Sequence, residues 1–212
     1  MQKRKSNKTF VDRFYYEGKA REDGFKMIAG IDEAGRGPLA GPVVASAVIV
    51  KDREFEHRVD DSKKISPSVR EKAFIEIMEK CYVGIGSASV EEIDRINIFN
   101  ATLLAMKRAV EELSVRPDFL LIDGKMEVHL PQPKVCLIRG ESLSFSVACA
   151  SIIAKVFRDK IMVEQDVIYP EYNFKQHKGY GTKEHIENIR NHGLSTIHRK
   201  SFGPFGSKKK SR

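Results

Sequence analysis

Residues 28–50 read I-A-G-I-D-E-A-G-R-G-P-L-A-G-P-V-V-A-S-A-V-I-V, two apolar runs separated by a glycine-rich turn. Apolar runs bounded by glycine and proline are typical of buried strands, so we expect a strand on each side of the turn. The first run ends on adjacent carboxylates, Asp32 and Glu33. Ionised carboxylates are costly to bring near a core unless a cation or hydrogen bonds compensate them. Because Mg²⁺ is held by one or two carboxylates plus water and phosphate oxygens, this pair can begin a metal site that other residues must complete.

The turn between the two strands carries Gly35, Arg36 and Gly37. Glycine lets the backbone approach a ligand closely, and the arginine places a guanidinium at the mouth of the carboxylate pair. The spacing G-x-G-x-x-x-G, followed by a strand, does not fit a dinucleotide-binding loop, which leads into a helix. A plain hairpin that needs glycine only for its own geometry is the alternative interpretation.

The composition is that of a globular protein, with 41% hydrophobic and 31% charged residues in a chain of 212. No apolar run approaches the roughly 20 residues of a membrane-spanning helix, and the basic N-terminal stretch lacks the apolar region of a secretory signal. We therefore expect a cytoplasmic protein without membrane contact. The three cysteines share no C-x-x-C spacing, which argues against a disulfide framework and a thiolate zinc site. The net charge of +8 favours nucleic acid as a partner, although solvated lysine side chains would give the same charge.

Apolar periodicity and turn residues predict the elements that follow. Ser66 before Pro67 predicts a helix start, because serine caps helix N-termini and proline suits the first turn. Gly84, Gly86 and Ala88 predict a strand that packs closely against its neighbours. The expected strands cover residues 28–33, 43–50, 81–90, 118–123 and 135–138, and the expected helices cover residues 67–80, 99–114, 144–166 and 182–192. This mixture predicts an α/β fold.

The composition also divides the chain into four parts. Residues 1–26 form a charged arm with scattered aromatic residues, in which little chemistry is expected, and residues 27–168 form the main domain. Residues 169–203 are aromatic and basic and include the helix expected at residues 182–192. Residues 204–212 are a basic tail predicted to be disordered, because lysine and serine bury too little surface to offset the entropy of ordering.

Four acidic residues lie at or just beyond predicted strand ends: Asp32, Glu33, Asp123 and Glu141. Loops at the ends of neighbouring strands converge, so these carboxylates can meet in space. Two divalent ions roughly 4 Å apart would relieve their repulsion and would also serve in-line phosphodiester chemistry. The alternative is that each acid only caps a turn, since Asp-Gly is an ordinary turn sequence.

Six strings carry a family resemblance: A-G-I-D-E-A-G-R-G-P-L-A-G-P-V-V, D-D-S-K-K, L-I-D-G, A-S-I-I-A-K-V-F-R-D, H-K-G-Y-G-T and H-R-K-S-F. Together they resemble bacterial ribonuclease HII, the type 2 ribonuclease H family, over about residues 27–203. The resemblance implies a ribonuclease H-like mixed sheet flanked by helices, with a C-terminal helical extension. It also implies endonucleolytic cutting of RNA–DNA hybrids, and of duplex DNA at single embedded ribonucleotides, with a role in DNA repair and replication.

Carried onto this sequence, the resemblance makes Asp32, Glu33 and Asp123 ligands of Mn²⁺ or Mg²⁺, with two ions present when substrate is bound. The family's fourth acid is usually an aspartate after glycine, and this chain has Glu141 after Gly140. Glutamate is one methylene longer, so Glu141 would coordinate in a shifted pose or through water. Asp159 is a rival fourth acid, but its place on the long helix makes it a better partner for Arg158 or Lys155.

The resemblance also names the substrate-binding residues. Gly35, Arg36 and Gly37 would contact the 2′-hydroxyl and the phosphates of the ribonucleotide, as suits backbone that can approach closely. Tyr180 would pack on the next sugar, and the alternative for it is a half-buried core aromatic. Lys63 and Lys64 would contact phosphates, or they are solvated surface lysines.

The predicted activity is hydrolysis on the 5′ side of a ribonucleotide by a monomer, leaving 3′-hydroxyl and 5′-phosphate ends. A ribonuclease H-fold nuclease acting on DNA junctions and a non-catalytic duplex-binding module are the alternatives. No serine lies in G-x-S-x-G, so a serine hydrolase is not indicated. The spacing of His177, His185, His192 and His198 fits no compact zinc motif, and these side chains are expected at the surface or facing phosphates.

Overall fold

The computed structural model describes residues 12–203, so the start of the arm and the predicted basic tail at residues 204–212 lie outside the described part. Its centre is a mixed five-stranded sheet in the order β3-β2-β1-β4-β5. The strands are β1 (Ile28–Ala34), β2 (Val43–Val50), β3 (Cys81–Ala88), β4 (Phe119–Asp123) and β5 (Lys134–Leu137). The α/β prediction is therefore confirmed.

The direction of the strands places the acidic residues together. β1 pairs antiparallel with β2 and parallel with β4, and β4 pairs parallel with β5. Ile31 lies opposite Ile122, so Asp32 follows directly on one strand and Asp123 on the other. Because parallel strands end at the same edge of a sheet, both acids reach one edge, as the sequence predicted.

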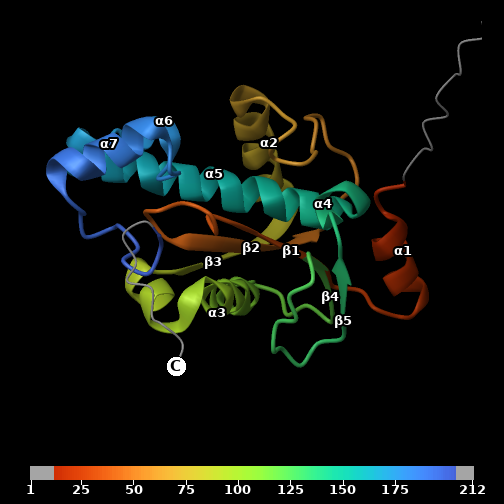
Figure 1. Ribbon diagram of the computed structural model, residues 1–212. Coiled ribbons are helices and arrows are strands. Elements are labelled where there is room, and N and C mark those ends of the chain that lie inside the picture. The colour runs from red at the N-terminus through yellow and green to blue at the C-terminus, as the bar shows by residue number, and fades with distance from the viewer. Residues whose placement is uncertain (1–11, 204–212) are drawn as a thin grey trace, which may run out of the picture.

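Helices cover both faces of this sheet (Figure 1). They are α1 (Tyr15–Glu22), α2 (Pro67–Lys80), α3 (Val90–Glu111), α4 (Gly140–Leu143), α5 (Phe145–Ile168), the 3₁₀ helix η1 (Pro170–Tyr172), α6 (Phe174–His177) and α7 (Lys183–His192). α5 crosses one face of the sheet with α2 beside it, and α3 lies on the other. None of the helices in residues 12–203 combines the length and apolarity needed to span a bilayer.

The core has two halves because side chains alternate across the strands. On one side, Ala45 and Ala47 of β2 pack with the Ala101, Ala105 and Ala109 stripe of α3. On the other side, Val48 packs with residues of α2 and α5. The close packing predicted for β3 is confirmed, since a Cβ at Gly86 would lie 2.3 Å from the Ala105 carbonyl oxygen.

The cap predicted at Ser66 is present, and Ser144 caps α5 in the same way. The Ser66 hydroxyl accepts from the Val69 amide at 3.4 Å, and the Ser144 hydroxyl accepts from the Val147 amide at 3.2 Å. Helix α3 differs from the prediction, because it begins at Val90 rather than at residue 99. Asn97, at φ 66, interrupts the helical geometry there and shifts the apolar periodicity on which the prediction depended.

The N-terminal arm is held firmly against the main domain. The Glu17 carboxylate of α1 is buried and accepts from the Ser144 hydroxyl at 2.6 Å and the Ser146 amide at 3.0 Å. Arg13, just before α1, accepts at its carbonyl from the Phe145 amide at 2.7 Å. The arm therefore contacts the start of α5 next to the acidic edge of the sheet.

Candidate active site

A cavity of about 350 Å³ opens at the edge of the sheet where β1 ends. The residues around it include Asp32, Glu33, Gly35, Arg36, Gly37, Lys63 and Tyr180. The structure thus brings together seven of the ten site residues expected from the sequence. A larger groove of about 440 Å³ lies between α2 and α5, but its Glu71 and Asp159 are each paired with a lysine.

The acids at this edge act on one another electrostatically. Burial raises the pKa of Asp32 well above its ordinary value, and the charges of Glu33 and Asp123 raise it further. Burial also raises the pKa of Glu141, and Asp123 adds more to this shift than Asp61 does. Like charges disfavour ionisation of their neighbours only over short distances, so the ends of β1 and β4 and the start of α4 bring their carboxyl groups into one electrostatic field.

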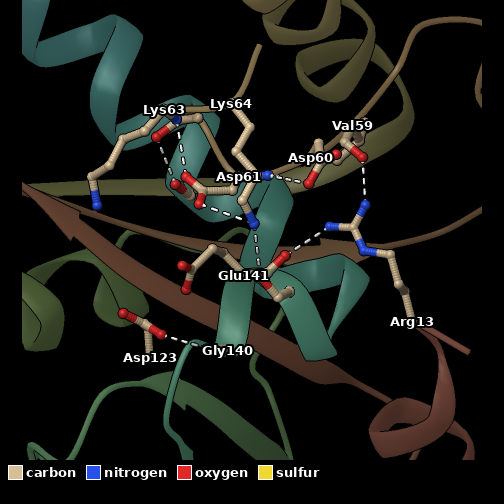
Figure 2. A network of polar contacts seen from close by, with 12 residues as sticks. Arg13, Val59, Asp60, Asp61, Lys63, Lys64, Asp123, Gly140 and Glu141 are labelled. Atoms are coloured by element: carbon tan, nitrogen blue, oxygen red, sulfur yellow. Dashed lines mark hydrogen bonds and ion pairs between the residues drawn. The ribbon is translucent and has the colours of Figure 1, made fainter. Parts of the chain in front are cut away.

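Gly140 fixes the orientation of Asp123. Its amide donates to Asp123 Oδ1 at 2.6 Å, and a Cβ at this position would lie 3.2 Å from the same oxygen. Figure 2 shows Asp123 directed at Gly140, with Glu141 next to it in the first turn of α4. The sequence pair Gly140-Glu141 therefore couples the ends of β4 and β5.

Two buried carboxylate oxygens near this edge have no hydrogen-bond partner among the described residues: Oε2 of Glu33 and Oε2 of Glu141. A buried anionic oxygen without a partner is costly, and an oxygen-preferring divalent cation would compensate it. Within residues 12–203 no three acidic, histidine or cysteine side chains already converge on one point. One reason is that Glu33 is turned toward Arg36, with Oε1 3.3 Å from the guanidinium. The donor set fits a divalent cation in its chemistry, and the Glu33 side chain would have to turn toward Asp32 to join it.

The segment 59–64 forms a second wall of the site (Figure 2). Asp61 is buried, and its Oδ1 accepts from the Lys63 amide at 2.9 Å. Lys64 Nζ lies 3.4 Å from Asp61 Oδ2 and donates to the Ser142 hydroxyl at 3.3 Å, so Lys64 is tied to α4 while Lys63 lines the cavity. The sequence analysis did not single out Asp61, although it is part of the D-D-S-K-K string.

Arg13 joins this wall to α4. Its guanidinium donates to the carbonyl oxygens of Val59 at 2.5 Å and Glu141 at 2.8 Å. Figure 2 shows the side chain reaching both segments from the N-terminal arm. The expectation that the arm takes little part in the site omitted this residue, whose role depends on contacts far apart in the sequence.

The backbone geometry of the turn explains why residue 35 is glycine but does not explain why residue 37 is glycine. Gly35 has φ +97, and a Cβ there would collide with Arg158. Gly37 has no such requirement, and a Cβ would meet only the Tyr180 ring, at 3.8 Å. Its missing side chain leaves open space beside Tyr180, whose ring is 44% exposed and is therefore not a core aromatic.

The expectation that the C-terminal histidines lie at the surface is wrong for three of the four. His177, His185 and His198 are buried, with the rings of His177 and His185 stacked at 4.3 Å. His185 Nε2 lies 3.0 Å from His198 Nε2, and His185 Nδ1 lies 2.9 Å from the Tyr180 carbonyl oxygen. The flanking residues are polar, so the local pattern resembled a surface segment.

The fold and the acidic edge of its sheet define a protein of the ribonuclease H-like class. The structure is similar to the ribonuclease H2 from Pyrococcus horikoshii OT3, with a TM-score of 0.72 over 85% of this chain and 95% of that one at 23% identity. It is also similar to a Bst ribonuclease HIII in complex with Mn²⁺, with a TM-score of 0.64 over 88% of this chain and 70% of that one at 22% identity.

The sequence places the chain within this class. The family model described as Ribonuclease HII matches residues 29–204. Ribonuclease HII of Thermotoga maritima is 56% identical over 85% of this chain and 74% of its own length. The chain belongs to the ribonuclease HII family and is a ribonuclease H hydrolase, which confirms the family, fold and enzyme class predicted from the sequence.

Proposed function

We propose that the protein hydrolyses the phosphodiester on the 5′ side of ribonucleotides, in RNA–DNA hybrids and at single ribonucleotides embedded in duplex DNA. The observation that carries the proposal is the gathering of carboxyl groups from separate segments beside a glycine-rich loop, where burial raises the pKa of Asp32 and Glu141 and the charge of Asp123 adds to both shifts. A cluster of buried carboxylates that is costly without a bound cation suits cation-dependent hydrolysis of a phosphodiester. The products would carry 3′-hydroxyl and 5′-phosphate ends.

The residues proposed to hold divalent ions are Asp32, Glu33 and Asp123, with Glu141 as a further catalytic acid. The unpartnered oxygens of Glu33 and Glu141 support this set, as does the Mn²⁺ in complex with the structurally similar ribonuclease HIII. Two Mg²⁺ or Mn²⁺ ions, when bound, would activate the attacking water and stabilise the leaving oxygen. Gly140 would keep Asp123 in place through its 2.6 Å hydrogen bond.

The substrate would lie along the glycine-rich loop and Tyr180. Backbone at Gly35, Arg36 and Gly37 can reach the ribose because no side chain fills the space at Gly37. The exposed Tyr180 ring would pack on the neighbouring sugar, since an aromatic face suits such a contact. Lys63 at the cavity wall, and Lys64 beside it, would bind phosphates.

The rest of the chain would supply general duplex affinity. The net charge of +8 suits salt-dependent, sequence-independent binding of a phosphate backbone. We assign catalysis to residues 27–168 and substrate binding to residues 169–203, acting as a monomer because one chain supplies every proposed group. A cytoplasmic location and a role in DNA repair and replication stay predictions.

The test compares an all-DNA duplex, a duplex with one ribonucleotide and an RNA–DNA hybrid in Mg²⁺ and in Mn²⁺, with the cut site mapped. Asp32→Asn and Asp123→Asn should each lower kcat at least about 100-fold while duplex binding is kept, as expected for groups that act mainly on the transition state. Asp159→Asn is the matched control, since that acid is paired with Lys155 at 2.7 Å.

Three results would contradict the proposal in different ways. Full turnover by either active-site variant would refute the assignment of the acids. Cleavage of the all-DNA duplex at a similar rate would favour a junction-type nuclease. An absence of cleavage of any duplex with either ion would favour a binding module.

A further inference from the structure

The buried guanidinium groups of Arg199 and Arg158 bind backbone carbonyl oxygens of the glycine-rich loop. Arg199 is 2% exposed and Arg158 is 1% exposed. Arg199 donates to carbonyl oxygens of Gly35 at 2.6 Å, Arg36 at 3.1 Å, Pro38 at 2.8 Å, Gly41 at 2.9 Å and Pro42 at 3.2 Å. Arg158 donates to carbonyl oxygens of Ala40 at 3.1 Å, Pro42 at 3.1 Å and Lys178 at 3.0 Å. The carbonyl groups of the loop are thus held by residues far along the chain.

Neither arginine has a carboxylate partner in the described part of the chain. A buried cation without a counter-ion is costly unless hydrogen bonds compensate it, and here the backbone carbonyl oxygens provide that compensation. Burial, together with the nearby charge of Arg158, lowers the pKa of Arg199 to about 9. The two guanidinium groups and the loop carbonyls therefore depend on one another for their burial.

The bonds to Arg199 fix where the amide groups of the loop point. In a trans peptide the C=O of one residue and the N–H of the next lie in one plane and point in opposite directions. Because Arg199 binds the carbonyls of Gly35 and Arg36, the amides of Arg36 and Gly37 point away from Arg199. Within residues 12–203 these two amides donate no hydrogen bond, whereas the amides of Leu39 and Gly41 are both bonded at 2.8 Å.

The two unbonded amides belong to residues that line the cavity. Successive free N–H groups form a concave donor surface that suits an anion. The positive charges of Arg158 and Arg199 lie on the carbonyl side of these peptide groups and add to the attraction of the amides for a phosphate. Arg158 also binds the carbonyl of Lys178, two residues before Tyr180, so both substrate-facing segments share one support.

We propose that Arg199, supported by Arg158, is a positioning residue that turns the Arg36 and Gly37 amides toward the cavity, where they bind the non-scissile phosphate on the 3′ side of the ribonucleotide. This inference rests on the proposed function and adds to it the group that orients the loop. Neither arginine touches the substrate. Their effect on catalysis passes through the backbone of the loop.

The test combines a protein variant with a substrate change. Arg199→Lys keeps a cation but cannot bind five carbonyl oxygens, and the neutral methylphosphonate at the 3′ phosphate removes the charge that the amides would bind. Each change alone should lower kcat/KM for the single-ribonucleotide duplex by about 10-fold to 100-fold, as expected for misplacement of about 1 Å. Made together, they should cause little more loss than the larger single change, because both remove the same contact.

The matched control is Lys200→Ala, which removes a neighbouring exposed cation whose side chain is not bound to the loop. Its effect should multiply with that of the methylphosphonate. Losses that also multiply for Arg199→Lys would overturn the inference, since a residue needed only for folding would not be coupled to one phosphate. If Arg199→Lys does not fold, as judged by its thermal unfolding, Arg158→Lys is tested by the same criterion.

This outcome is separable from that of the proposed function. If the unaltered enzyme cleaves no ribonucleotide-containing duplex, the proposed function fails. If it cleaves and the two losses multiply, only the role of the arginines is wrong.

Discussion

Acidification from pH 7 to pH 5 should destabilise the protein through His185 and His198. The Ser195 amide donates to His198 Nδ1 at 2.9 Å, so the neutral His198 ring carries its proton on Nε2. That proton is donated to His185 Nε2, and His185 then donates from Nδ1 to the Tyr180 carbonyl. A second proton on either ring would place two donors against each other.

The magnitude follows from the pKa values. Burial lowers the pKa of both His185 and His198 from an ordinary value of 6.5 to about 4. A folded-state pKa below the unfolded one means that the unfolded chain binds protons first as the pH falls. This contribution to stability is fully present above pH 6.5 and is lost progressively toward pH 4. Between pH 7 and pH 5 each histidine should cost about 2 kcal/mol of unfolding free energy, and because the rings are coupled the pair should cost less than twice this.

Urea unfolding at pH 7 and pH 5 measures the effect. His198→Gln cannot take up the proton, so its stability should fall less over this range, by about 2 kcal/mol. His129→Gln, at an exposed position, is the control and should behave like the unaltered protein. Asp32 and Glu141, whose pKa values are raised, gain stability on acidification, but they do so equally in all three proteins. The same loss in His198→Gln as in the unaltered protein would refute the reasoning.

Two further predictions concern the arm and the packing of the sheet. Arg13→Ala should lower kcat about 10-fold, because α4 and segment 59–64 lose their common hydrogen-bond donor. The control is Arg53→Ala, which removes a guanidinium stacked on the same arm and should leave kcat unchanged. Equal losses of kcat in the two variants would mean that the arm acts only by supporting the fold. Gly86→Ala should lower the unfolding free energy by about 1–3 kcal/mol, since the added Cβ would meet α3 backbone at 2.3 Å. Gly18→Ala, in open space on α1, should raise the unfolding free energy by about 0.5–1 kcal/mol. Thermal unfolding measures both variants, and a change of the same sign in Gly86→Ala and Gly18→Ala would contradict this account.

Local pattern was sufficient for the sheet and for the acids at its edge. The strands ending at Glu33 and Asp123 are short apolar runs, and strand direction alone brings their ends together. Cap residues such as Ser144 are equally local, since a hydroxyl satisfies a helix end within three residues. The strands and caps could be predicted because each depends on neighbours in the sequence, and the meeting of the acids followed from the general convergence of loops at the ends of neighbouring strands.

The supporting residues could not be predicted in this way. Arg13 and Arg199 lie in charged segments that are typical of a solvated surface, and their partners are up to 164 positions away. Asp159 was expected to pair with Arg158 or Lys155, and it pairs with Lys155, whereas Arg158 binds carbonyl oxygens, which the sequence did not indicate. The tertiary fold decides which polar group a buried cation contacts. The local sequence pattern does not indicate that partner.

The dependence of residues 35–42 on Arg199 also has a consequence for biosynthesis. A nascent chain that has left the ribosome as far as β2 can form its first hairpin, yet the carbonyl groups of that loop still lack the guanidinium that binds them. For most of translation, the carbonyl groups in the turn of this hairpin therefore lack their hydrogen-bond donor, Arg199. Under the role proposed for Arg199, we expect the substrate surface to form only after the H-R-K-S-F segment has emerged and docked, so an incomplete chain would carry the acids without that surface.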